Sequence, residues 1–196
     1  REAVEATTRW DIALAGAELS RRYDMSRPSL DSATMRLKNA RFIPCEEECK
    51  RMALAYSPLS AEFSAAAVVL FGSNMGGKTV VLKTALFFQL VAQAGLFVPA
   101  EAFATRVFDR IEYVGELDGE RLAGLSGFGL EVWRLSRAWN DGCVNGSSAL
   151  VAFDELARTT GSHEAEALLS AVVEAYSSGQ GEGRAFFATH FRGVAR

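Results

Sequence analysis

The sequence has few of the residues that mark secreted or metal-binding domains. It contains three cysteines, Cys45, Cys49 and Cys143. An odd number favours free thiols in a reducing, cytoplasmic setting over a disulfide framework. A zinc site at Cys45 and Cys49 would need two more ligands, and the only histidines in the sequence are His163 and His190, so we do not favour one. We therefore expect ordinary solvated thiols on this charged segment.

Long apolar runs and an excess of positive charge are also missing. The most apolar run, residues 79–98, contains Lys83, Gln89 and Gln93, which argues against a membrane span. The net charge of -3 gives no sign of a basic patch for nucleic acid, so any DNA contact is expected from other parts of a larger protein. A content of 49% hydrophobic and 23% charged residues is ordinary for a globular domain.

The chain reads as a piece of a longer protein, because it opens on an arginine and closes on "FRGVAR" without a clear helix end. Residues 1–30 are predicted to be the helical end of a preceding domain, and residues 31–196 a second domain. The helix should cover residues 1–25, with Ile12, Ala15 and Leu19 on one face, and Pro28 should interrupt it. Residues 33–44 and 50–58 resemble short strands around an acidic turn.

From residue 65 onward, strand and helix patterns alternate. Strands are predicted within residues 65–71, 106–115, 148–155 and 184–190, and helices within residues 78–94, 130–139 and 162–176. This alternation predicts an α/β fold with a mostly parallel sheet flanked by helices, preceded by a short N-terminal helical segment. Ligands of such folds bind at the carboxyl ends of the strands.

The stretch "LFGSNMGGKTVVLK", residues 70–83, joins the first of these strands to a helix and has the spacing of a phosphate-binding loop. Glycines let backbone N–H groups approach phosphates, and the helix N-terminus adds positive charge. Lys78 would reach the β- and γ-phosphates, and the Thr79 hydroxyl would coordinate magnesium. The predicted nucleotide-binding residues are Gly72, Ser73, Asn74, Met75, Gly76, Gly77, Lys78 and Thr79.

Two further strands end in residues that suit the same chemistry. "ALVAFDE" carries Asp154, which can hold the magnesium shell, and Glu155, which can orient or deprotonate the attacking water. "AFFATH" ends at His190, a candidate sensor of the γ-phosphate. Taken alone, each could be an ordinary polar residue at a strand end.

A second glycine-rich loop, "GLSGFGLE" at residues 124–131, precedes a helix and offers another anion site. One triphosphate does not need two such loops in one chain. We therefore expect Ser126 and Gly127 to cap the nucleotide of a second subunit, in a homodimer with two composite sites. The alternative is a plain glycine-rich turn before a helix.

Together these motifs resemble the MutS family of DNA mismatch-repair ATPases, within the ABC class, from about residue 8 to the end. "GSNMGGKT" is similar to the family's GPNMGGKS/T loop, "FDELARTTGS" to its acidic box and "FATHF" to its histidine motif. "LSGFGLE" keeps the signature spacing with Ser126, Phe128 and Glu131. The resemblance implies the ABC class of P-loop NTPases, with ATP or ADP and Mg²⁺ as ligands. It implies catalytic roles for Lys78, Glu155 and His190, metal ligation by Thr79 and Asp154, and action of Ser126 in trans.

The resemblance also implies an ATPase whose ATP state is coupled to a clamp on mismatched or branched DNA, bound through domains outside this sequence. Tyr56 is our candidate for the adenine contact, with ordinary core packing as the alternative. Ser73, Gly127 and "RTTGS" depart from the family pattern. They keep open an anti-recombination paralogue, or a MutS-like ATPase that reactivates a B12-dependent aminomutase. A transporter subunit fits less well, because its signature continues "GGQ" where this chain has "GFG".

Overall fold

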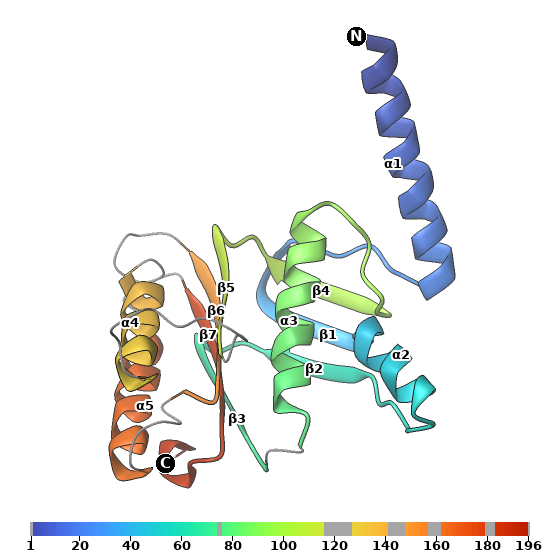
Figure 1. The fold of residues 1–196 in the computed structure, drawn as a ribbon. Helices are drawn as coiled ribbons and strands as arrows, with labels where there is room; N and C mark the ends of the chain where they lie inside the picture. Colours follow the sequence, from blue (N-terminus) through green and yellow to red (C-terminus); the bar gives the residue numbers. More distant parts are fainter. Residues whose placement is uncertain are drawn as a thin grey trace. The chain divides into compact units, whose positions relative to one another are not determined.

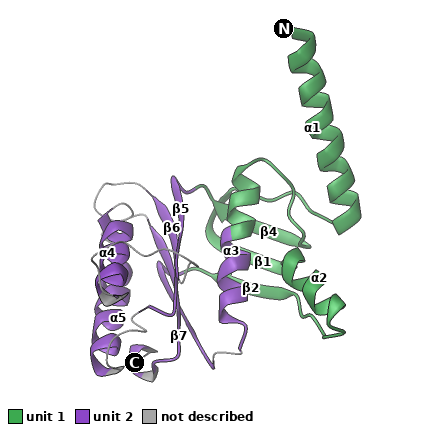
Figure 2. Ribbon diagram, in the orientation of Figure 1, with its two compact units in different colours: residues 1–64, 87–107 green, residues 65–86, 108–196 purple. Residues whose placement is uncertain are grey.

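The computed structural model of the chain describes residues 2–73, 76–115, 127–140, 148–156, 162–178 and 183–195. By its internal contacts the chain forms two compact units (Figure 1 and Figure 2). Unit 1 comprises Arg1–Ser64 and Phe87–Val107, and unit 2 comprises Ala65–Leu86 and Phe108–Arg196. Helix α3 (Lys78–Gln93) contributes its first half to unit 2 and its second half to unit 1. The predicted boundary after residue 30 stays a prediction.

Unit 1 begins with helix α1 (Glu2–Tyr23), which confirms the helix predicted at the start of the chain. The helix ends at Tyr23 because Asp24 adopts a left-handed φ of 49°, and the Met25 N–H then donates to the Ser20 carbonyl (2.9 Å). Pro28 is thus not the cause of the break. The predicted apolar face is not buried within the described part of the chain, where Ile12 is 60% exposed.

The body of unit 1 is a three-stranded antiparallel sheet in the order β2-β1-β4. Strand β1 (Asp31–Ala40) lies at the centre, between β2 (Leu59–Phe63) and β4 (Ala102–Arg106). The prediction of β1 is confirmed, whereas the strand expected at residues 50–58 is wrong, because the second strand begins only at Leu59. Strand β4 was not predicted.

The acidic turn predicted between these strands is in fact helix α2 (Ile43–Arg51). Pro44 suits the first turn of a helix, and Glu46 near its start with Lys50 near its end complements the helix dipole. Glu46 and Lys50 also form an i,i+4 ion pair at 2.9 Å. Cys45 lies on this helix, and partial burial, reinforced by the neighbouring Cys49 thiol, raises the pKa of its thiol.

Unit 2 contains a four-stranded, fully parallel sheet in the order β3-β7-β6-β5. Its strands are β3 (Ala67–Phe71), β5 (Arg110–Val114), β6 (Ala149–Asp154) and β7 (Arg184–Thr189). The helices of this unit are the first half of α3, α4 (Gly127–Trp139), α5 (Ser162–Ser177) and the short 3-10 helix η2 (Arg192–Ala195). The parallel sheet and alternating helices confirm the predicted α/β class.

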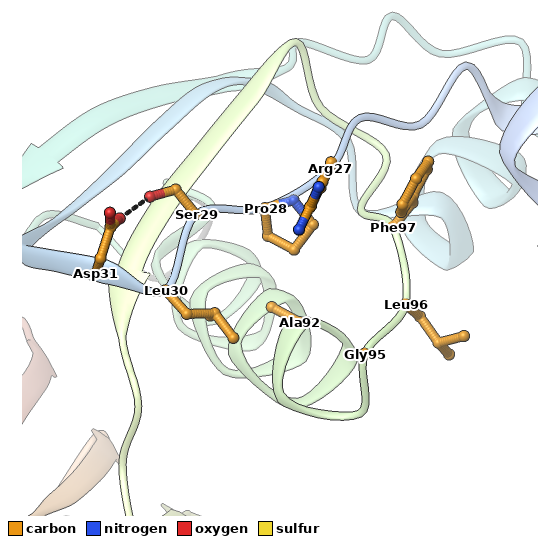
Figure 3. Close-up of a pocket in the computed structure, with 9 residues that line it drawn as sticks. All are labelled: Arg27, Pro28, Ser29, Leu30, Asp31, Ala92, Gly95, Leu96 and Phe97. Carbon is orange, nitrogen blue, oxygen red and sulfur yellow. Dashed lines mark hydrogen bonds between the residues drawn. The ribbon is translucent and has the colours of Figure 1, made fainter.

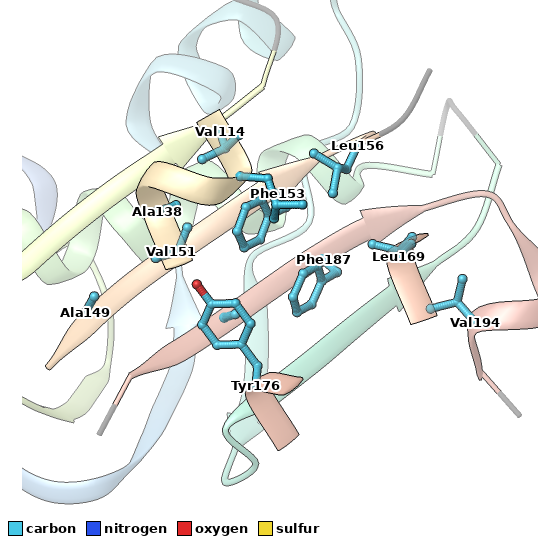
Figure 4. Close-up of a cluster of buried hydrophobic side chains, with 12 residues drawn as sticks. Val114, Ala138, Ala149, Val151, Phe153, Leu156, Leu169, Tyr176, Phe187 and Val194 are labelled. Atoms are coloured by element: carbon cyan, nitrogen blue, oxygen red, sulfur yellow. The ribbon is translucent and has the colours of Figure 1, made fainter. Parts of the chain in front are cut away.

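The core of unit 2 lies between one face of this sheet and helices α4 and α5 (Figure 4). Phe153 of β6 and Phe187 of β7 are fully buried and stack with their ring centroids 4.9 Å apart. Tyr176 of α5 packs edge-on against both rings. Residues on the opposite face of β6 and β7, such as Leu150 and Phe186, are also buried. The side chains of the two central strands are therefore buried on both faces of the sheet, except for the half-buried Asp154 at the end of β6.

Candidate functional site

The parallel sheet of unit 2 brings three of the predicted motifs to one edge. Strands β3, β7 and β6 are neighbours, and their register pairs Phe71 with Thr189 and Asp154 with Ala188. The glycine loop that follows β3, the acidic pair at the end of β6 and His190 after β7 therefore leave the sheet at the same edge. We call this the carboxyl edge of the sheet.

The glycine loop, residues 72–79, connects β3 to α3. The Lys78 ammonium curls back over it and donates hydrogen bonds to the carbonyls of Gly72 and Ser73, both at 2.8 Å. Lys78 is only 7% exposed, so this charge is held close to the backbone. Gly77 has a left-handed φ of 75°, a conformation that favours glycine. Asn74 and Met75 lie outside the described residues.

Helix α3 starts at the end of this loop and presents its N-terminus to it. Its first turn closes when the Val81 N–H donates to the Gly77 carbonyl at 3.0 Å. The amides of the residues before Val81 have no partner within the helix, as at any helix N-terminus, and the helix dipole adds positive charge there. Thr79 is half-buried in this turn. Backbone donors, an ammonium and a hydroxyl thus gather where an anion with a bound cation would fit.

The acidic pair lies at the end of β6, and its two members differ in their surroundings. The Tyr113 hydroxyl of β5 donates to Asp154 Oδ2 at 2.7 Å. Asp154 Oδ1 is buried and has no hydrogen-bond partner among the described residues. A buried carboxylate oxygen without a hydrogen-bond partner is suited to bind a cation or a water of its shell. Mg²⁺ prefers oxygen ligands of this kind. Desolvation, followed by the hydrogen bond to Asp154, raises the pKa of Tyr113, so its hydroxyl remains a donor at neutral pH.

Glu155 follows with a left-handed backbone, φ 53°, which is uncommon for a residue with a side chain. Its N–H donates to the Ala188 carbonyl of β7 at 3.0 Å, which ties this turn to the neighbouring strand. The chain therefore changes direction just after Asp154. Such strained conformations concentrate at functional sites.

His190 is the first residue after β7 and is exposed. Its ring lies against the Phe191 ring, with the centroids 4.3 Å apart. The Phe191 N–H donates to the Thr189 hydroxyl at 3.1 Å, which fixes the turn that carries the histidine. An exposed imidazole at this edge is free to meet a ligand.

The remaining predicted residues belong to unit 1 or to helix α4, or fall outside the described residues. Ser126 is not described, and Gly127 is the first residue of α4. Tyr56 belongs to unit 1, where its hydroxyl accepts a hydrogen bond from the Phe42 N–H at 2.7 Å. Partial burial raises the pKa of Tyr56. The motif residues that meet at the carboxyl edge all belong to unit 2, and the role of Tyr56 stays a prediction.

Sequence reasoning missed Tyr113, the residue that holds Asp154. The sequence did contain a signal for it. "RIEYVG" and "ALVAFD" are both strands, and neighbouring parallel strands end at the same edge, so a tyrosine near the end of one can reach an aspartate at the end of the other. The strand order that makes β5 and β6 neighbours was not predictable from either segment.

Unit 1 contains a pocket of about 590 Å³ between the start of β1 and the end of α3 (Figure 3). Its lining includes Arg27, Asp31 and Phe97. The Ser29 hydroxyl donates to the Asp31 carboxylate, and this bond lowers the pKa of Asp31. The pocket contains none of the residues predicted for nucleotide binding.

None of the described helices combines the length and apolar character needed to cross a bilayer. Nor do the described residues include a cluster of three or more histidine, cysteine, aspartate or glutamate side chains suited to a metal ion.

Comparison with known proteins finds the same family by a family model and by individual relatives. Residues 68–196 match the family model described as MutS domain V. The chain is 32% identical, over 98% of its length, to the DNA mismatch repair protein MutS of Caulobacter vibrioides and to that of Granulibacter bethesdensis, covering 22% and 21% of those proteins. It is 28% identical over its whole length to the Syntrophomonas wolfei protein of the same name, covering 22% of it. The chain thus spans about a fifth of the length of these relatives.

Proposed function

Because the chain belongs to the MutS family, we propose that its unit 2 binds ATP with Mg²⁺ and hydrolyses it as a P-loop ATPase of the ABC class. The observation that carries this proposal is the convergence of three groups at the carboxyl edge of one parallel sheet. These are the glycine loop with the Lys78 ammonium, the carboxylates of Asp154 and Glu155, and His190. Nucleotide sites of α/β proteins occupy this position.

The glycine loop binds the phosphates. Its ammonium is already oriented by the carbonyls of Gly72 and Ser73, and on binding it exchanges these neutral acceptors for phosphate oxygens. The N-terminus of α3 adds backbone donors and the positive end of its dipole. The remaining loop residues, including Asn74 and Met75, complete the cradle in this proposal.

The fit of Mg²⁺ rests on the donor set. The Thr79 hydroxyl and the buried Asp154 Oδ1 are hard oxygen donors of the kind that Mg²⁺ takes, directly or through water. When bound, Mg²⁺ neutralises charge on the transferred phosphoryl group. Asp154 is already held by Tyr113, so one of its oxygens is oriented before any ligand arrives.

Glu155 and His190 act on the reacting water and the γ-phosphate. The left-handed backbone of Glu155 turns the chain away from the strand just after Asp154, the proposed metal ligand. The Glu155 carboxylate then orients or deprotonates the attacking water. His190, exposed at the end of the neighbouring strand, contacts the γ-phosphate. In this proposal the base, Glu155, and the sensor, His190, directly follow two neighbouring strands, β6 and β7.

The active form in this proposal is a homodimer. Gly127, at the N-terminus of α4, and Ser126 before it act on the nucleotide of the partner subunit. The chain alone is then a slow ATPase whose specific activity rises with protein concentration. Fast hydrolysis by a chain that stays monomeric would contradict the composite site.

In the full-length protein, we propose that the ATP state drives a clamp on mismatched or branched DNA. Relatives named as DNA mismatch repair proteins support the DNA-repair setting of this proposal. The net charge of -3 favours DNA contact through segments outside this chain. Full-length protein that binds neither DNA substrate, with or without ATP, would instead favour the aminomutase-reactivating alternative. Preference for branched over mismatched DNA would favour an anti-recombination paralogue.

The experiment that tests the ATPase proposal separates binding from turnover. We expect Glu155→Ala to bind a fluorescent ATP analogue with Mg²⁺ like the wild type but to release phosphate at least about a hundredfold more slowly, because the water loses its base. Glu174→Ala removes an exposed carboxylate on α5 and should behave like the wild type in both assays. Normal phosphate release by Glu155→Ala would refute the assigned role.

A further inference from the structure

Asp154 is held by one specific side chain, the phenol of Tyr113. We infer that Tyr113 is a positioning residue for the metal site: its hydroxyl fixes the Asp154 carboxylate so that Oδ1 remains directed to the Mg²⁺ shell. The inference rests on the proposed function, because it concerns how the proposed metal ligand is oriented. It adds a residue from β5, a strand that carries none of the predicted motif residues.

The sheet register explains why these two side chains meet. Strands β5 and β6 are parallel neighbours, and Tyr113 pairs with Ala152, two residues before Asp154. The long phenol spans this offset along the strand direction, and its hydroxyl donates to Oδ2 at 2.7 Å. The short distance and the charged acceptor make this one of the stronger types of hydrogen bond.

The consequence for Asp154 is an asymmetric carboxylate. The terminal torsion of an aspartate is broad, so without a partner the carboxylate plane rotates easily. The Tyr113 bond occupies Oδ2, while Oδ1 is buried and has no partner among the described residues. Only Oδ1 is therefore available to a metal or its water, and its direction is fixed in advance.

Gly115 provides independent support, because the Tyr113 ring occupies the space that a side chain at this position would need. A Cβ at position 115 would lie 2.7 Å from Tyr113 Cε1 and 2.8 Å from its hydroxyl oxygen. Any side chain there would force the phenol away from Asp154. Arg134 of α4 donates to the Gly115 carbonyl at 3.0 Å, so the backbone that makes this room is itself held.

The test measures metal affinity, using Mn²⁺ as a spectroscopic substitute for Mg²⁺. Free Mn²⁺ is followed by electron paramagnetic resonance in the presence of a non-hydrolysable ATP analogue. We expect Tyr113→Phe to weaken Mn²⁺ binding about tenfold, as for other residues that orient metal ligands. Binding of the analogue without metal should be unchanged. ATP hydrolysis should need more Mg²⁺ for half-saturation but reach the wild-type rate at saturation.

Two further variants make the result specific. Gly115→Ala should also weaken Mn²⁺ binding, because its methyl group displaces the phenol while both residues of the Tyr113–Asp154 bond are kept. Tyr23→Phe removes a tyrosine-to-carboxylate hydrogen bond of 3.2 Å to Glu47 in unit 1 and should leave Mn²⁺ binding unchanged. Thermal unfolding of each variant checks that it is folded.

The outcomes separate the inference from the function on which it rests. Wild-type Mn²⁺ affinity in folded Tyr113→Phe would overturn the positioning role and leave the ATPase proposal intact. A wild-type chain that binds no Mn²⁺ with the analogue would overturn both. A loss of maximal rate at saturating Mg²⁺, without a change in metal affinity, would also contradict a positioning role.

Discussion

Replacing Lys78 by alanine should separate nucleotide binding from folding. In the structure, the ammonium makes two hydrogen bonds of 2.8 Å to backbone carbonyls and is 7% exposed. Hydrogen bonds of a charged group contribute about 1.5–3 kcal/mol each, but burying an ammonium costs several kcal/mol. Because these terms oppose each other, we expect the free energy of unfolding to change by only about 1 kcal/mol.

The effect on ATP should be much larger. Two charge-assisted contacts to phosphate oxygens contribute at least about 3 kcal/mol, so Lys78→Ala should weaken ATP binding by a factor of about a hundred or more. Titration calorimetry with ATP and Mg²⁺ measures the affinity, and urea unfolding measures the stability. Lys83→Ala, an exposed lysine one turn further along α3, is the matched control. Equal ATP affinity in Lys78→Ala and the wild type would refute this assignment of the loop.

Two other predictions concern the core and the predicted adenine contact. Phe187→Ala removes a fully buried ring stacked on Phe153. The free energy of unfolding, measured by urea denaturation, should fall by about 3–5 kcal/mol. A loss below about 1 kcal/mol would contradict the packing. Tyr56→Phe should bind ATP like the wild type, while losing about 1 kcal/mol of stability with the bond from the Phe42 N–H. Tyr56→Ala should weaken ATP binding, and unchanged affinity would leave Tyr56 a packing residue.

The central part of the fold was predictable because its signals are local and strong. The apolar runs ending at Phe71 and Asp154 and the strand ending at Thr189 could each be read from the sequence, and the structure confirms them as parallel neighbours. Their convergence follows from a general property of parallel sheets, whose strand ends share one edge. The motif positions therefore implied a common site before any strand order was known.

The N-terminal region was less predictable because competing signals overlap. The charge-rich segment after Ile43 resembles an acidic turn in the sequence, although a proline in its first turn and an acidic residue before a basic one favour a helix. Strand β4 (Ala102–Arg106) has no clear alternation of its own and is defined by pairing with β1. Such pairing is a tertiary contact, which a local pattern does not contain.

The details of the site depended on strand order in the same way. Tyr113 reaches Asp154 only because β5 is the neighbour of β6, and Gly115 matters only because the phenol lies over it. Neither residue belongs to a recognisable nucleotide-binding motif. The motif residues identify the chemistry, whereas the residues that orient them become visible only in three dimensions.

The most direct test of the central claim is a crystal structure of the chain with Mg²⁺ and a non-hydrolysable ATP analogue. We predict that the γ-phosphate lies against the Lys78 ammonium and that Mg²⁺ lies about 2.1 Å from the Thr79 hydroxyl, with Asp154 Oδ1 facing its shell. The Tyr113 bond to Oδ2 should persist. Nucleotide bound away from the loop of residues 72–79, or no nucleotide at saturating concentration, would contradict the account.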